Sequence, residues 1–104
     1  MAQVPNQVIN SIKRFKESIK SGLNVKKVIL FGSYARGNYT DNSDIDVCII
    51  AENISNSYLA MLQIAPKAVD IDVRIEPVVF SDEEFSEANL YGLLKEVKNY
   101  GIEV

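Results

Sequence analysis

Hydrophobic residues recur at helical spacing in the first part of the chain. Apolar side chains stand three or four positions apart, and lysine, arginine and glutamate fill the positions between them. This periodicity predicts an amphipathic helix with one apolar face, ending near Gly22. The apolar positions are Val4, Val8, Ile9, Ile12, Phe15 and Ile19.

Two apolar runs then predict buried strands on either side of a turn-rich stretch. Val28–Phe31 is short, unbroken and rich in β-branched residues, and Asp44–Ile50, which carries two aspartates among apolar residues, predicts a second strand. Between them we expect a short helix at Ser33–Arg36 and a loop over residues 38–43. In the second strand, the odd positions from Ile45 onward should face the core.

The second half of the chain mixes both periodicities. Tyr58–Ile64 predicts a short helix that Pro66 stops, and residues 69–76 alternate strictly, which predicts a strand with Pro77 at an edge or exit. Ser81–Glu84 has the pattern of a capping box that opens a helix. A last helical face, ending near Gly101, consists of Leu90, Leu93, Leu94 and Val97.

This order of elements predicts an α/β (α+β) fold, in which helices pack on one small mixed β-sheet. The chain has 104 residues, so we expect a single domain spanning residues 1–104. An apolar fraction of 47% is ordinary for a soluble protein, and no apolar run is long enough to span a membrane. Because the N-terminus also lacks a signal-peptide pattern, we expect a cytoplasmic protein.

The composition narrows the chemistry to carboxylates. The chain contains no histidine and one cysteine, which excludes Ser-His and Cys-His nucleophile schemes and an internal disulfide. Carboxylate oxygens favour hard cations such as magnesium. A net charge of -3 argues against direct nucleic-acid binding, which normally needs a basic surface.

Gly32-Ser33 directly follows the first predicted strand. Glycine lets the backbone approach a ligand closely, and the N–H groups that open the following helix suit a phosphate. The same dipeptide is also compatible with a turn that merely needs glycine.

Asp44 and Asp46 begin the second predicted strand. Residues i and i+2 of a strand point to the same face, so both carboxylates can converge on a cation. Aspartate is disfavoured in strands, which argues that two of them here have a function. The alternative is a turn-forming Asp44 followed by a solvated Asp46.

Residues 70–76 place four charged side chains on one face of the predicted third strand. These are Asp70, Asp72, Arg74 and Glu76. The like charges would repel one another unless a bound divalent cation, or in part Arg74, neutralises them. For Asp70 and Glu76, a solvent-exposed edge is an equally good interpretation, whereas for Asp72 we favour a function.

These features together resemble the polymerase-beta-like nucleotidyltransferase superfamily, and within it the minimal nucleotidyltransferase (MNT) group. The stretch GSYARGNYTDNSDID matches the Gly-Ser and spaced aspartate pattern without a gap. The resemblance extends over residues 8–104 and implies the polymerase-beta-like nucleotidyltransferase fold. It also implies two magnesium ions on three carboxylates, with Asp44 and Asp46 as paired ligands and Asp72 as the third. Asp70 is the alternative third carboxylate.

The resemblance further implies that ATP is the substrate. Gly32 and Ser33 match the phosphate-binding turn, and Arg36 lies where a cation can help to hold the phosphates. A chain of this length has no room for the acceptor-binding domain of larger relatives. We therefore expect the acceptor to be held by another chain, or the cleft to be completed in a homo-oligomer.

Short MNT proteins act beside a HEPN-domain partner as toxin–antitoxin pairs. The resemblance thus implies an antitoxin that transfers AMP from ATP to a tyrosine of a HEPN toxin. Two alternatives are a nucleotidyltransferase that modifies a small hydroxylated molecule, and a non-catalytic antitoxin that neutralises its partner by contact alone.

Overall fold

The computed structural model describes residues 3–87 and 92–104 of the chain. The helices are α1 (Asn6–Ile19), α2 (Ser33–Arg36), α3 (Ser57–Ile71), α4 (Asp82–Glu87) and α5 (Gly92–Tyr100). The strands are β1 (Asn24–Phe31), β2 (Ile45–Glu52), β3 (Ile75–Ser81) and β4 (Ile102–Glu103).

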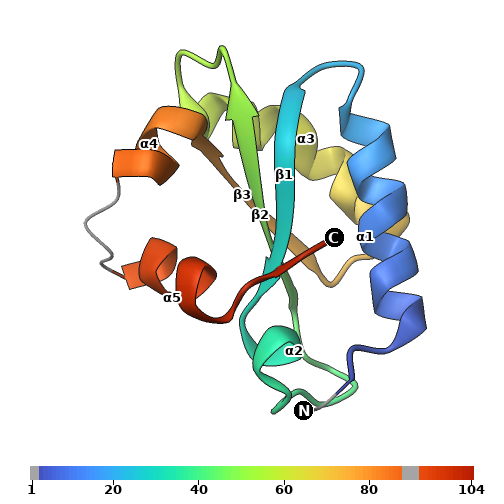
Figure 1. Ribbon diagram of the computed structural model, residues 1–104. Helices are drawn as coiled ribbons and strands as arrows, with labels where there is room; N and C mark the ends of the chain where they lie inside the picture. Colours follow the sequence, from blue (N-terminus) through green and yellow to red (C-terminus); the bar gives the residue numbers. More distant parts are fainter. Residues whose placement is uncertain (1–2, 88–91) are drawn as a thin grey trace.

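The four strands form one mixed sheet in the order β3-β2-β1-β4. β1 runs antiparallel to both β2 and β4, whereas β2 and β3 are parallel. The parallel pair is connected by α3, which crosses one face of the sheet (Figure 1). The predicted small mixed sheet with packed helices is confirmed.

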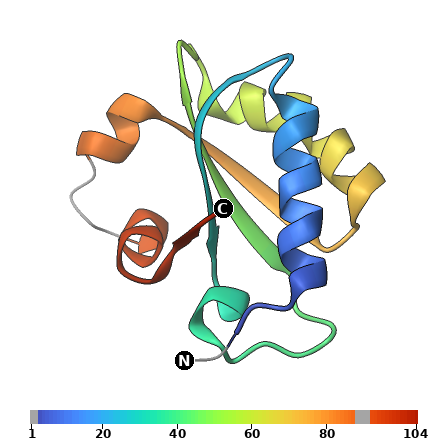
Figure 2. The same cartoon turned by 45° about the vertical axis from the view of Figure 1, so that its right-hand side comes forward.

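Helices cover both faces of the sheet, with α1 and α3 on one side and α4 and α5 on the other (Figures 1 and 2). Ile45, Val47 and Ile49 of β2 are fully buried in the cluster that includes α1 and α3, as predicted. Cys48 and Ile50 of the same strand are buried in a second cluster, together with Val97 of α5. β2 is therefore an interior strand that is buried on both faces, which explains its almost unbroken apolar sequence.

Local signals account for several helix boundaries. Val8, Ile12, Phe15 and Ile19 form the buried face of α1. The capping box before α4 is confirmed: the Glu84 N–H donates to Ser81 Oγ at 3.0 Å, and the Ser81 N–H donates to Glu84 Oε1 at 2.9 Å. Leu90 of the predicted last helical face lies outside the described residues. Among the helices that the structure describes, none is long and apolar enough to cross a membrane.

Two predictions for the middle of the chain are wrong. The helix predicted to stop at Pro66 continues to Ile71 with the proline inside it, and residues 69–71 belong to this helix rather than to a strand. The buried residues Ala60, Ile64 and Ala68 stand four apart, which is helical spacing. The apparent alternation came from exposed residues, of which Val69 is 57% and Val73 is 79% exposed.

The third strand lies further along the chain than predicted, at Ile75–Ser81, and includes Pro77. A proline has no N–H to donate to a neighbouring strand. β3 is at an edge of the sheet, so the missing donor leaves no pairing incomplete there.

Replacing Pro66 by alanine tests the course of α3. Pro66 is exposed, and alanine would restore an N–H inside the helix without removing a buried contact. We expect the free energy of unfolding to rise, by up to about 3 kcal/mol, because proline disfavours a helix interior by that amount. Chemical denaturation of both proteins measures this. A decrease would indicate that Pro66 stiffens a loop and would contradict the helix.

Candidate active site

A depression of about 530 Å³ opens where β1 ends and β2 begins, next to α2. Its walls come from the end of β1, α2, the start of β2, β3 and α5. The lining residues are Phe31, Gly32, Ser33, Arg36, Ser43, Asp44, Asp46, Glu76, Val78, Leu93 and Glu96. Five of the six residues proposed from the sequence therefore lie around one pocket.

Strand register brings two of the carboxylates together. In the parallel pairing of β2 with β3, Asp46 is the partner of Glu76, and in the antiparallel pairing of β1 with β2 it is the partner of Phe31. Paired residues of neighbouring strands point to the same face of a sheet. Asp46 and Glu76 therefore extend from the face that α5 covers, while Ile45 and Ile75 on either side are buried against α1 and α3.

Asp46 is in a strongly negative environment. Partial burial, followed by the nearby charges of Glu76, Asp44 and Glu96, raises the pKa of Asp46 to about 6, and Arg36 opposes this effect. The cause is that burial and like charges both disfavour the ionised carboxylate. A bound cation would reverse this balance, so the pocket has the electrostatic character of a cation site.

Gly32 packs directly against the Asp46 side chain. Its backbone has φ +77°, and a Cβ atom at this position would collide with the Asp46 carboxylate. The positive φ favours glycine, since other residues rarely adopt it, and any larger residue would also push the Asp46 carboxylate from its place. The Gly-Ser turn and Asp46 are thus in contact, although α2 and a loop separate them in the sequence.

Arg36 and Glu96 face each other across the pocket. The Arg36 Nη1 atom lies 3.9 Å from Glu96 Oε1, and both side chains are partly exposed. The predicted basic side chain, Arg36, therefore lies at the pocket, and the Glu96 carboxylate of α5 lies beside it. Glu96 was not predicted, because no local pattern indicates that α5 folds back over this end of the sheet.

Asp72 is not brought to this pocket. It is the C-cap residue of α3, and its carboxylate accepts hydrogen bonds from Arg74 Nε at 3.1 Å and from Nη2 at 2.9 Å. These bonds hold the pKa of Asp72 below its usual value, although partial burial opposes them. The alternative, Asp70, is exposed on α3. Both predictions depend on a strand over these residues, and neither residue lies on one.

Glu76, rather than Asp72, is the acidic residue that the strand register places beside Asp46. It is the first residue after Ile75 in β3, beside Asp46. The sequence signal is its alternation with apolar neighbours, which is equally typical of an exposed strand edge. Choosing Glu76 required the register between β2 and β3, which residues far apart in the sequence determine.

Oxygen donors around the pocket suit magnesium. Asp44, Asp46 and Glu76 supply carboxylates, the ligand type that magnesium prefers. Within residues 3–87 and 92–104, no three such groups already stand close enough to hold an ion. The carboxylate ligands therefore fit magnesium by their chemistry. To coordinate one ion together, these side chains would have to rotate toward it.

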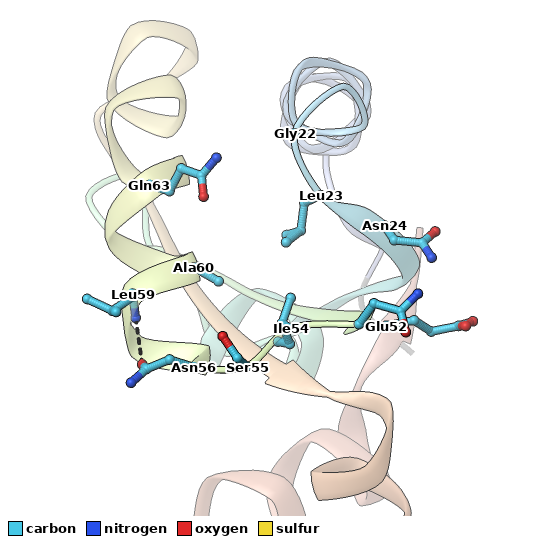
Figure 3. A pocket seen from close by; sticks show the side chains of 11 residues that line it. Gly22, Leu23, Asn24, Glu52, Ile54, Ser55, Asn56, Leu59, Ala60 and Gln63 are labelled. Atoms are coloured by element: carbon cyan, nitrogen blue, oxygen red, sulfur yellow. Dashed lines mark hydrogen bonds between the residues drawn. The ribbon is translucent and has the colours of Figure 1, made fainter.

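A second depression, of about 330 Å³, lies at the opposite end of the sheet (Figure 3). Residues between α1 and β1 and at the start of α3 line it, including Leu23, Asn56 and Gln63. Asn56 caps α3 by accepting a hydrogen bond from the Leu59 N–H at 2.9 Å. Glu52 is the one charged residue that lines this second depression, which therefore lacks the carboxylate cluster of the first pocket.

Comparison with known families assigns the chain to a class of protein. The model of the nucleotidyltransferase domain family matches residues 12–104. The chain therefore belongs to the nucleotidyltransferase family, as the resemblance of its motif implied.

A curated relative is similar over nearly the whole chain. The Methanocaldococcus jannaschii protein named "Putative protein adenylyltransferase MJ0141" is 35% identical over 103 residues, which cover 94% of this chain and 99% of that protein. This similarity supports the family assignment independently of the domain model.

Solved structures share the fold. The crystal structure of "a putative nucleotidyltransferase from Sulfolobus solfataricus" has a TM-score of 0.60 at 20% identity, and covers 99% of this chain and 89% of that one. A crystal structure of a "toxin-antitoxin with AMP-PNP" has a TM-score of 0.61 at 23% identity, and the match covers 94% of this chain and 69% of that one. At these identities the likeness is one of fold.

Gly32→Ala tests the contact between the turn and Asp46. The added methyl group meets the Asp46 carboxylate at a positive φ, and we expect a loss of about 1–3 kcal/mol in the free energy of unfolding. Gly92→Ala is the matched control. Gly92 also has positive φ, at +52°, but apart from its chain neighbours and the backbone of its own helix, no atom of the described residues lies within 4 Å of the place that a Cβ would take. Equal losses in the two variants would contradict the contact.

Asp72→Asn tests the pairing with Arg74. Because this pKa is lowered by folding, the ionised carboxylate stabilises the protein above the usual aspartate pKa of about 3.9, and the contribution disappears as the pH falls through the folded pKa. We expect the variant to lose about 1 kcal/mol at pH 7, and less below about pH 4. Denaturation at both pH values measures this. Asp70→Asn, an exposed control, should change neither value.

Proposed function

We propose that this chain transfers AMP from ATP to a hydroxyl group of a partner protein, and that the acceptor is a tyrosine of a HEPN-domain toxin. The chain would then act as the antitoxin of the pair. The observation that carries this proposal is the pocket in which Asp44, Asp46 and Glu76 surround the Gly32-Ser33 turn.

In the proposed site, Asp44, Asp46 and Glu76 would hold the magnesium ions. When bound, magnesium neutralises the charge of the triphosphate in reactions of this type. Gly32 and Ser33 bind the phosphates at the end of β1, and Arg36 exchanges Glu96 for a phosphate oxygen. We assign the third carboxylate to Glu76 rather than Asp72, because Glu76 is the strand partner of Asp46.

The reaction needs no covalent enzyme intermediate. The acceptor oxygen attacks the α-phosphorus of ATP, the bond to the β-phosphate oxygen breaks, and pyrophosphate leaves. Glu76 orients the acceptor hydroxyl and takes its proton as the new bond forms. The absence of histidine from the sequence is consistent with this use of carboxylates.

The comparisons support a nucleotide as the substrate and a protein as the acceptor. The relative from Methanocaldococcus jannaschii is named as a protein adenylyltransferase, and one structure of the same fold is a toxin–antitoxin complex with an ATP analogue. The pocket is open to solvent and is lined by exposed Asp44 and Glu76. A side chain of another protein can therefore approach it.

Intact mass spectrometry tests the transfer. Purified protein, magnesium and ATP are incubated with each helical protein that co-purifies with it, and mass gains in steps of AMP identify the acceptor. We expect Asp44→Asn and Glu76→Gln to reduce the rate about 100-fold or more at saturating magnesium, because each removes a carboxylate from the pocket. Asp72→Asn and Asp70→Asn should retain most of the activity under the same conditions.

The variants also separate the alternatives. Loss of activity in Asp72→Asn with full activity in Glu76→Gln would restore Asp72 as the third carboxylate. If Asp44→Ala still neutralises the partner toxin, the chain acts by contact and the proposed transfer is wrong. Transfer to a small hydroxylated molecule, with none to a protein, would identify the other type of nucleotidyltransferase.

A further inference from the structure

Arg74 connects the end of α3 to the segment that precedes β2. Its Nε and Nη2 atoms donate to the two carboxylate oxygens of Asp72 at 3.1 and 2.9 Å. The third nitrogen, Nη1, donates to the Tyr34 hydroxyl at 3.1 Å and to the Asp41 carbonyl oxygen at 3.4 Å. The guanidinium group thus uses all three nitrogens, and Asp72 fixes its orientation through two of them.

The backbone of Arg74 holds the same segment. The Ile45 N–H donates to the Arg74 carbonyl oxygen at 2.8 Å. Asp44 therefore lies between two attachments to Arg74, one through the Asp41 carbonyl and one through Ile45. Only 28% of the Arg74 side chain and 16% of the Asp72 side chain are exposed, so solvent does not readily replace these bonds.

Tyr34 extends the network into the loop. Its side chain is buried, and its ring stacks on that of Tyr39 with the centroids 4.5 Å apart. The Tyr34 hydroxyl donates to the Thr40 carbonyl oxygen at 3.4 Å, and the Thr40 N–H donates to Ser43 Oγ at 2.8 Å. The loop over residues 39–45 is consequently held on both sides of Asp44.

Asp44 itself is exposed, and none of the side-chain hydrogen bonds found among the described residues involves it. Its position beside Asp46 therefore depends on the loop that carries it. We propose that Arg74 is a positioning residue that holds this loop so that Asp44 stays beside Asp46, and that Asp72 acts by orienting Arg74. This inference rests on the proposed function, in which Asp44 is a magnesium ligand.

The hydrogen bonds of Arg74 predict how its replacement changes the dependence of nucleotide binding on magnesium. Without the guanidinium group the loop samples more conformations, and magnesium must select those in which Asp44 is correctly placed. The magnesium concentration needed for nucleotide binding therefore rises, while binding at saturating magnesium is retained.

Titration of magnesium against a fixed concentration of AMP-PNP tests this, with bound nucleotide measured by equilibrium dialysis. We expect Arg74→Gln to raise the magnesium concentration for half-maximal binding at least fivefold. Tyr34→Phe, which keeps the ring stack and the pair with Asp72, should raise it about two- to threefold. Asp82→Asn is the matched control: it removes a 2.8 Å ion pair with Lys26 outside this network, and it should leave the midpoint unchanged.

The outcomes distinguish this inference from the proposed function. If the wild-type protein binds no AMP-PNP with magnesium, the proposed function fails. If it binds, and folded Arg74→Gln has the wild-type midpoint, the positioning role is wrong. Should Arg74→Gln fail to fold, Tyr34→Phe decides the question by the same criterion. An equal increase in Asp82→Asn would show a general loss of stability and would also overturn the inference.

Discussion

The parallel pairing of β2 with β3 is the interaction on which the carboxylate pocket depends. It makes Glu76 the neighbour of Asp46 on one face of the sheet, while Ile45 and Ile75 enter the core on the other. Partial burial disfavours the ionised Asp46, and the like charge of Glu76 beside it adds to the cost, so the pKa of Asp46 rises to about 6. The apolar layers on both sides of β2 stabilise the register against this repulsion.

The unfavourable charges are confined to one end of the strands. Further along β2, Val47, Ile49 and Ala51 are fully buried, and their burial offsets the cost of the acidic end. Gly32 lets the turn after β1 approach Asp46 closely, and Arg74 donates a hydrogen bond to the loop before β2. Three features therefore hold the pocket together: the close approach of the Gly32 turn to Asp46, the hydrogen bonds of Arg74 to the loop before β2, and the register between β2 and β3.

Local patterns predicted much of the fold. The apolar face of α1, the two strands flanking the motif and the capping box before α4 each depend on residues close together in sequence. The error around Pro66 arose because exposed Val69 and Val73 imitate the alternation of a strand. Tertiary packing of Ile64 and Ala68 against the sheet outweighed both that pattern and the helix-breaking tendency of proline.

The sequence by itself determined the motif by which the chain resembles its family: a Gly-Ser turn after a buried strand and a spaced aspartate pair, in a chain without histidine. These are local features, and their spacing constrains where the side chains lie. Only the tertiary structure decided which later acidic residue joins the pair. It separated Glu76 from Asp72 through the register of two strands that a helix connects. It also brought Glu96 of α5 to the pocket and placed Arg74 against the loop that carries Asp44. Strand register depends on packing summed over a whole face, which no short stretch of sequence contains.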